Sequence, residues 1–213
     1  MTTLLADDFN RTLSGTWGNS SHGEAWTQRL GASNQLSCNG TQGKIDNTTA
    51  GRVIMAIGSA LSDVEVTVTA TPGTSDSEIG VGARLQADNL SYYSFRVNGT
   101  AGGALIYRID NGTATQIAGI SAFTLTPGTA YDLKFRVIGS SLRAKVWSHG
   151  SAEPGTWLFD ITDATYASGG CGVVAVPQNS TGVLFDDFLV TDGGAPVLPQ
   201  MAPNYFPRNY MIW

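Results

Sequence analysis

The carboxylate side chains are the first residues of this sequence that could do chemistry. Hydrolysis of a glycosidic bond needs two carboxylates flanking the bond, roughly 5–10 Å apart. The chain has four glutamates, Glu24, Glu65, Glu78 and Glu153. Asp63 and Glu65 alternate with valines, so they share one face of an expected strand. An exposed acidic strand face is the simpler interpretation of that pair, and we therefore expect no glycosidase activity.

The histidines, serines and cysteines form no recognisable catalytic or metal-binding pattern. His22 and His149 lie in Gly/Ser-rich contexts, and no Gly-x-Ser-x-Gly elbow accompanies them. No Cys/His cluster has the spacing of a zinc site. Cys38 and Cys171 are too few for a disulfide scaffold, and they could pair or remain two buried thiols. The sequence therefore predicts that the protein is not an enzyme.

Cationic and aromatic side chains form the most distinctive candidate binding surface. If Val81 and Ala83 face the core, Arg84 faces outward, because successive side chains of a strand point to opposite faces. The same parity on the other strands gives a row of outward residues: Arg84, Tyr92, Arg96, Arg108, Arg136, Lys145 and Trp147, with Lys134 and Arg143 beside them. If these strands share a sheet, the row is a basic face that could bind an anionic or hydroxyl-rich glycan, or an acidic protein. The alternative is solvated charge that protects against aggregation.

Apolar and polar residues alternate with a period of two through most of the chain. In residues 63–69 the valines face one side and Asp, Glu and Thr the other, which is typical of a half-buried strand. Asp110-Asn111-Gly112 between two such segments predicts a hairpin. The pattern places Leu105, Tyr107 and Ile109 in the core opposite Arg108. The other predicted core residues are Val66, Val68, Val81, Leu85, Phe95, Val97, Leu133, Phe135, Val137, Phe185 and Phe188.

Composition excludes several classes of protein. Hydrophobic residues make up 42% of the 213, which is enough for a core and rules out wholesale disorder. The 26 glycines and the low charged fraction of 14% are unlike a coiled coil and favour short strands with tight turns, hence a β-sandwich or barrel. A net charge of −5 argues against nucleic acid as a partner. No stretch approaches the roughly 20 apolar residues of a membrane span, so we expect no membrane insertion.

The last residues differ from the rest of the chain. Residues 193–213 hold four of the eight prolines, which break regular strands, and they are densely aromatic. We therefore divide the chain into a domain of residues 1–192 and a Pro-rich, extended C-terminal arm of residues 193–213. The candidate assembly residues of the arm are Tyr205, Phe206, Arg208, Tyr210 and Trp213, types that include common interface anchors. We expect the arm to pack on a neighbouring subunit of a homo-oligomer or larger assembly, and the alternative is that it folds back over its own domain.

Several motifs together resemble those of a known superfamily. They are Asp7-Asp8-Phe9-Asn10-Arg11, Gly15-Thr16-Trp17-Gly18, Gly23-Glu24-Ala25-Trp26, Gly80-Val81-Gly82-Ala83-Arg84, Asn89-Leu90-Ser91-Tyr92-Tyr93-Ser94-Phe95-Arg96-Val97 and Val183-Leu184-Phe185-Asp186-Asp187-Phe188-Leu189-Val190. Residues 4–192 thereby resemble the concanavalin A-like lectin/glucanase superfamily, and they are most similar to its LamG-like or keto-disaccharide-hydrolase-like domains. The resemblance implies an all-β, two-sheet antiparallel jelly-roll sandwich. This fold hosts lectins, hydrolases and structural modules, so it does not by itself fix a function.

The resemblance also implies where a catalytic or metal site could lie. Related glucanases carry Glu-x-Asp-x-x-Glu on one strand, and this sequence lacks that motif. The first and last strands of such jelly rolls are expected to be neighbours, which would bring Asp7 and Asp8 to Asp186 and Asp187. Clustered carboxylates suit Ca²⁺, so these four are the candidate calcium ligands and Ca²⁺ is the candidate cofactor. The alternative is that they cap strand ends and accept hydrogen bonds from nearby backbone amides.

The opening motif is similar to that of minor tail proteins from phages of actinobacteria. This resemblance implies a non-catalytic virion protein that is made in the host cytoplasm and assembled into the particle. Its partners would be a host-surface glycan or neighbouring virion subunits. The opening residues lack a charged n-region and a long apolar h-region, so we expect no signal peptide. The alternative function is that of a carbohydrate-active hydrolase or carbohydrate-binding module.

Overall fold

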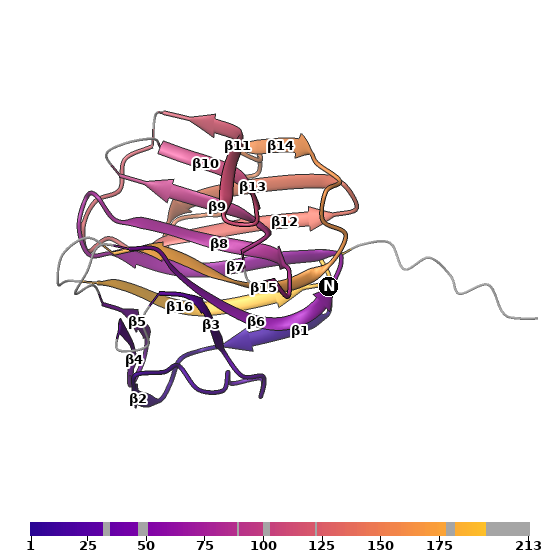
Figure 1. Cartoon of the computed structure of the whole chain (residues 1–213). Coiled ribbons are helices and arrows are strands. Elements are labelled where there is room, and N and C mark those ends of the chain that lie inside the picture. The colour runs from indigo at the N-terminus through magenta and orange to yellow at the C-terminus, as the bar shows by residue number, and fades with distance from the viewer. Residues whose placement is uncertain are drawn as a thin grey trace, which may run out of the picture.

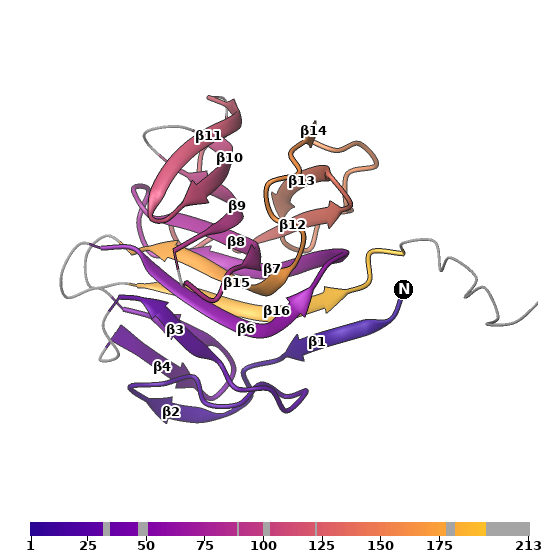
Figure 2. The ribbon, with the colours of Figure 1, turned by 45° about the vertical axis from the view of Figure 1, so that its right-hand side comes forward.

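The chain folds into two antiparallel β-sheets. The structure is a computed structural model that describes residues 1–31, 35–46, 51–88, 90–99, 103–121, 123–177 and 182–194. Within these ranges there is no α-helix, and so none that could cross a membrane. The sheets lie face to face (Figures 1 and 2). The predicted all-β, two-sheet antiparallel sandwich is therefore confirmed.

The larger sheet has nine strands among the described residues. Their order is β14 (Phe159–Thr162), β13 (Ser141–Ser148), β12 (Tyr131–Ile138), β7 (Val64–Pro72), β16 (Val183–Thr191), β5 (Gly43–Ile45), β4 (Leu36–Asn39) and β2 (Thr12–Ser14), with β1 (Thr3–Asp7) pairing to β16 beside this path. The smaller sheet has the order β11 (Thr113–Ile120), β10 (Gly103–Asp110), β9 (Tyr92–Asn98), β8 (Glu78–Leu85), β15 (Gly169–Val176), β6 (Val53–Leu61) and β3 (Thr27–Leu30). The predicted hairpin joins β10 to β11 through Asn111 and Gly112, whose φ values of 46° and 84° suit a two-residue turn of type I′.

Period-two alternation sets the inner faces of both sheets. On β12, Leu133, Phe135 and Val137 are fully buried between the sheets, whereas Lys134 and Arg136 lie on the opposite face. All the predicted core residues outside residues 105–109 are buried, and all of these except Leu85 belong to the main core. We call the side of each sheet that faces away from this core its outer face.

The prediction that Leu85 faces the main core is wrong. Arg84 adopts a φ of +53°, and the register between β8 and β15 slips there, since Leu85 pairs with Gly170 while Ala83 pairs with Cys171. The extra residue forms a β-bulge, which turns the following side chain to the other face. Leu85 is therefore buried in a second cluster on the outer face of the smaller sheet: Ile54, Ala56, Leu85, Tyr92, Ile109 and Val174.

The predicted faces of β10 are also wrong. Ala104 and Ile106 face the main core, whereas Tyr107 and Ile109 pack in the outer cluster. Both faces of this strand carry apolar side chains, so alternation alone does not determine which face is inside. Arg108 consequently lies on the inner side, at the rim of the sandwich, where it pairs with Asp163 and Asp110.

Aromatic residues from the motifs near both chain ends form one buried cluster. The ring centroid of Trp17 lies 5.1 Å from that of Phe9 and 5.2 Å from that of Trp26, and Trp26 lies 4.9 Å from Phe188. A Cβ on Gly43 would lie 2.7 Å from the Phe9 ring, so glycine is needed where β5 crosses it. These motif residues therefore act in the core, where each large side chain contributes about 2–3 kcal/mol of burial.

Candidate functional site

The outer face of the larger sheet carries several accessible polar and aromatic residues. On β12 and β13, three directly opposed pairs follow one another along this face: Asp132 with Trp147, Lys134 with Lys145, and Arg136 with Arg143. β7 contributes Thr69 and Glu65 opposite Asp132 and Arg136. The part of the predicted basic row on these two strands, with Arg136, Lys145 and Trp147, therefore does share one face.

A groove of about 480 Å³ lies on this face, across β13, β12, β7 and β16. Its lining consists of Met1, Glu65, Thr67, Thr69, Asp132, Lys134, Trp147, His149, Asp187, Leu189 and Thr191. Trp147 is half-buried and Leu189 is 36% exposed, so both present apolar surface to solvent. A few polar groups around accessible apolar surface are typical of a small-molecule or glycan site. The groove is our candidate functional site.

A hydrogen-bonded network fixes the polar end of the groove. Thr69 donates from Oγ1 to Oδ1 of Asp132 at 2.7 Å, and Nδ1 of His149 lies 2.9 Å from the same oxygen. The hydrogen bond to Asp132 raises the pKa of His149 above its ordinary 6.5, and the charges of Asp187 and Asp186 raise it further. The His149 side chain is 50% exposed, so it remains accessible to a ligand. Sequence parity could have placed His149 with Trp147, but the partners from β7 and β12 depend on strand pairing.

Lys145 lies close to two tryptophan rings, those of Trp147 and Trp157. Its Nζ lies 4.6 Å from the ring centroid of Trp157 and 6.0 Å from that of Trp147, within reach of cation–π attraction. The same Nζ lies 2.7 Å from Glu153 and donates to the carbonyl oxygen of Pro154. Lys145 is therefore buried and internally satisfied, and it acts by holding the tryptophans.

Arg96 and Tyr92 lie on the smaller sheet and are not part of this face. Arg96 is 1% exposed; its Nε donates to Ser94 Oγ at 2.8 Å and its Nη2 to the Tyr92 hydroxyl at 3.1 Å. Its guanidinium also lies 4.8 Å from the ring centroid of Tyr107 and 3.5 Å from Glu78. Burial lowers the pKa of Arg96 below its ordinary value. Arg96 therefore points away from the main core, as alternation predicted, but neighbouring side chains shield it from solvent.

Arg84 is likewise enclosed and lies on the smaller sheet. It is 2% exposed, and it donates to the carbonyl oxygens of Ser62 at 2.9 Å and Tyr166 at 2.6 Å. Arg108 points to the inner side, as described above. The condition for one continuous basic face, that all these strands share a sheet, is not met, because the residues are divided between two sheets on opposite sides of the core.

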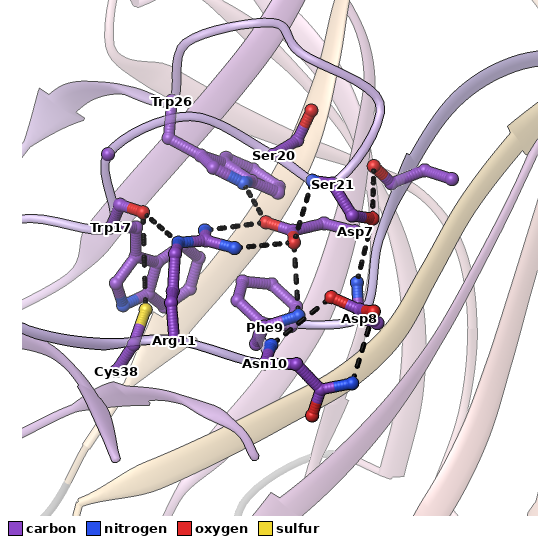
Figure 3. Close-up of polar contacts among 12 residues, drawn as sticks. Asp7, Asp8, Phe9, Asn10, Arg11, Trp17, Ser20, Ser21, Trp26 and Cys38 are labelled. Carbon is purple, nitrogen blue, oxygen red and sulfur yellow. Dashed lines mark hydrogen bonds and ion pairs between the residues drawn. The ribbon is translucent and has the colours of Figure 1, made fainter. Parts of the chain in front are cut away.

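Asp7 is a structural carboxylate at the centre of the N-terminal motifs (Figure 3). Both oxygens are used: Arg11 donates from Nη1 at 2.7 Å to Oδ1 and from Nη2 at 2.8 Å to Oδ2, and Trp26 Nε1 lies 2.5 Å from Oδ2. The amides of Phe9 and Ser21 donate to Oδ1 as well. Asp7 therefore does not fit the role of a calcium ligand, because Ca²⁺ would have to displace these donors.

The other candidate calcium ligands do lie near one another. β1 and β16 are neighbours, with Asp7 opposite Phe188, and Asp8 and Asp187 line the same hollow. Burial raises the pKa of Asp186, and the charges of Asp187 and Asp8 raise it further. Asp8 and Asp186 each accept a hydrogen bond from a nearby backbone amide, at 3.1 and 2.9 Å. Within the described ranges no group of three or more His, Cys, Asp or Glu side chains is arranged to hold a metal.

Tyr205, Phe206, Arg208, Tyr210 and Trp213 lie outside the described residues, as does residue 195 onward. Cys38 and Cys171 are both buried free thiols.

Comparison with solved structures finds similar folds. The carbohydrate-binding module CBM66 from Bacillus subtilis aligns with a TM-score of 0.61 at 17% identity, covering 78% of this chain and 94% of that one. β-Agarase A from Zobellia galactanivorans aligns with a TM-score of 0.62 at 13% identity, covering 87% and 89%. The exoplasmic/lumenal domain of VIP36 in a Ca²⁺-bound form aligns with a TM-score of 0.54 at 9% identity, covering 88% and 91%. No protein-family profile and no curated protein matches the sequence.

These similarities show the fold. The sandwich is a jelly roll, as the sequence motifs predicted, and its structural neighbours are galectin-like and concanavalin A-like jelly-roll domains. Solved structures with this fold include a carbohydrate-binding module, a glycosyl hydrolase family protein, a β-agarase and a Ca²⁺-bound domain. At these identities the similarity shows the fold of this chain and does not show its activity.

Proposed function

We propose that this protein is a non-catalytic carbohydrate-binding protein of a phage virion, in the tail, and that the groove beside Trp147 holds the glycan. The observation that carries the binding half is a half-buried tryptophan beside an apolar leucine and a rim of hydroxyl, carboxylate and imidazole groups. Such a rim can exchange hydrogen bonds with sugar hydroxyls, and the indole face can pack against a sugar ring.

The charges of the groove favour hydroxyl recognition there. Lys134 lies 3.3 Å from Glu65 and 2.7 Å from Glu153, and Asp132 is bound to His149. The paired ions leave little net charge at these positions, so the groove itself suits a neutral part of a glycan. The expectation of an anionic ligand therefore does not rest on the groove.

Removal of Trp147 tests the binding half. Purified protein is screened on a glycan array, and the affinity of the best glycan is measured by calorimetry for the parent and for Trp147→Ala. We expect at least about a tenfold loss, the scale of an aromatic anchor. Tyr107→Ala is the matched variant, because Tyr107 is a partly buried aromatic on the outer face of the other sheet. If Tyr107→Ala loses binding and Trp147→Ala does not, the glycan binds the smaller sheet and the assignment of the groove is wrong.

The alternative function is glycoside hydrolysis, and one observation favours it. Glu65, Asp132 and Asp187 are three carboxylates on the lining of one groove. Against it, Glu65 and Asp132 are engaged by Lys134 and His149. We expect no reducing sugar to be released from the bound glycan. Release that disappears in both Asp132→Asn and Glu65→Gln would establish the hydrolase instead.

The virion half of the proposal is supported by the similarity of the opening motif to phage minor tail proteins. Its partners are neighbouring virion subunits, contacted through the arm of residues 193–213. Deletion of residues 195–213 should leave glycan binding intact and abolish incorporation into particles, as judged by immunoblotting of purified virions. Normal incorporation of the truncated protein would exclude the arm as the assembly element.

A further inference from the structure

We propose that Arg136 and Arg143 form a subsite for an anionic group, the carboxylate or sulfate of an acidic glycan whose neutral part occupies the Trp147 groove. The two arginines are directly opposed on β12 and β13, on the outer face of the larger sheet. Figure 2 shows these two strands side by side. The glycan part of this inference rests on the proposed function, whereas the anion site itself does not.

Opposed like charges on neighbouring strands are unfavourable unless an anion lies between them. The neighbouring pair of like charges on these two strands shows how the chain supplies such an anion. Lys134 and Lys145 are also directly opposed, and the carboxylate of Glu153 lies 2.7 Å from each Nζ. Glu153 is thus a built-in anion that bridges the lysine pair.

No side chain does the same for the arginine pair. Arg136 makes no ion pair within the described residues, and its opposed residue on β7, Glu65, pairs with Lys134. Every Asp and Glu of the sequence lies within the described ranges, so no other part of this chain can supply a side-chain carboxylate. The charge of Arg136 is therefore available to an external anion.

Arg143 has one partner but an incomplete set of hydrogen bonds. Its Nε lies 3.0 Å from Oδ1 of Asp160, an ion pair between side chains that are 39% and 55% exposed. That contact lacks hydrogen-bond geometry, and the Nε atom is buried from solvent without an acceptor in the described part of the chain. A buried donor without an acceptor costs free energy, which an anion oxygen nearby could recover.

The space between the two arginines is hollow. A pocket of about 210 Å³ is lined by Arg136, Ile138, Ser141 and Arg143. The hydroxyl of Ser141 adds a neutral donor to the two guanidinium groups. Planar guanidinium groups match the paired oxygens of a carboxylate or sulfate, so this lining has the chemistry of an oxyanion site.

The pocket and the groove can be contacted by one ligand. Arg143 and Trp147 lie on the same face of β13, four residues apart, which is about 13 Å along a strand. An oligosaccharide that passes over the Lys145 position, which Glu153, Pro154 and Trp157 cover, can therefore place a sugar ring at Trp147 and an acidic substituent at the arginine pair. This geometry names the ligand class as an acidic glycan.

The anion site is tested first with small probes. Sodium sulfate, galacturonate and galactose are titrated into the full chain while the arginine Nε–Hε signals are followed by NMR, assigned with Arg136→Lys and Arg143→Lys. We expect the Arg136 and Arg143 signals to move with galacturonate, with sulfate or with both, and not with galactose. A response to only one anion identifies the source as a uronic acid or a sulfate ester. No movement with either anion overturns the proposal.

The second measurement uses oligosaccharides and a matched control. The affinity of the parent for an acidic oligosaccharide, uronate or sulfated according to the first result, is compared with that of its neutral counterpart. We expect a preference of at least about tenfold, lost in Arg136→Gln, partly kept in Arg136→Lys, and unchanged in Lys44→Gln, which removes a cation of β5 that is paired with Asp46. A preference that survives Arg136→Gln contradicts the subsite. If the arginine signals respond to anions but Trp147→Ala binds glycans normally, the groove assignment fails and the anion site stands.

Discussion

Arg11 holds Asp7 with two parallel hydrogen bonds of 2.7 and 2.8 Å, across one turn of chain that includes Phe9 (Figure 3). The Asp7 side chain is fully buried, whereas that of Arg11 is 20% exposed. Burial raises the pKa of Asp7, but the hydrogen bonds from Arg11, the Phe9 amide and Trp26 outweigh it, so the pKa lies below 3.8. The motif that made the sequence recognisable is thus a structural latch between β1 and the aromatic cluster.

Loss of the Asp7 charge should therefore weaken the fold. Asp7→Asn leaves the Arg11 guanidinium without its anion and replaces one acceptor with a donor. We expect the free energy of unfolding to fall by about 3 kcal/mol in chemical denaturation. Asp8→Asn is the control, because Asp8 is exposed and its carboxylate accepts hydrogen bonds from the backbone amide and the side-chain amide of the nearby Asn10. An equal loss of unfolding free energy in the two variants would show that the buried Asp7–Arg11 pair contributes no more to stability than an exposed carboxylate.

Gly172 should not tolerate a side chain. A Cβ at this position would lie 1.9 Å from the carbonyl oxygen of Met55, in the backbone of the neighbouring strand β6. Backbone cannot move aside without breaking the ladder, so Gly172→Ala should cost about 3 kcal/mol in thermal or chemical unfolding. Gly155→Ala provides the comparison, since nothing lies within 4 Å of its Cβ position. A Gly172→Ala protein as stable as Gly155→Ala would mean that β15 and β6 are not paired as described.

The strands and most of the core could be predicted from the sequence because both depend on local information. Alternation placed Val66, Phe95 and Phe135 correctly, since a single polar face opposite a single apolar face leaves no ambiguity. It failed at Arg108, where β10 is apolar on both faces. It also failed at Leu85, because the sequence gives no signal for a bulge at Arg84.

Only part of the candidate site could be predicted, because its residues come from strands that are far apart in sequence. The row on β12 and β13 follows from parity and one hairpin, so Arg136, Lys145 and Trp147 were grouped correctly on one face. The division of the cations between two sheets depends on non-local pairing, which alternation does not encode. The contact of Thr69 with Asp132 and His149 depends on the same pairing of β7 with β12.

Glu153 should stabilise the lysine pair that it bridges. Hydrogen bonds from Lys134 and Lys145 lower the pKa of Glu153, against the rise that burial causes. In Glu153→Gln the two opposed ammonium groups lose their shared anion, and we expect a loss of about 1 kcal/mol at low salt that shrinks as salt is added. Asp160→Asn, which removes an exposed pair with Arg143, should change stability by less. A Glu153→Gln protein with unchanged stability would contradict the bridging role and weaken the comparison with the arginine pair.

Asp163 should make stability depend on pH in the acid range. The carboxylate ties the segment after β14 to the smaller sheet, because it accepts hydrogen bonds from the Tyr93 hydroxyl at 2.5 Å and from Arg108 Nη1 and the Thr165 amide at 2.9 Å each. Although burial raises the pKa of Asp163, these donors lower it from 3.8 to about 2. A group whose pKa is lower when folded binds its proton more readily when unfolded, so its contribution to stability is present above pH 3.8 and is lost as the pH falls toward 2. The side chain is 11% exposed, so a shift of this size corresponds to about 2 kcal/mol.

We expect Asp163→Asn to be less stable than the parent by about that amount at neutral pH, and the difference to shrink steadily below pH 4 in urea denaturation. Asp160→Asn, an exposed neighbour on β14, should show no such pH-dependent difference. A gap between Asp163→Asn and the parent that stays constant from neutral pH to pH 2 would mean that the charge of Asp163 is not what holds this segment.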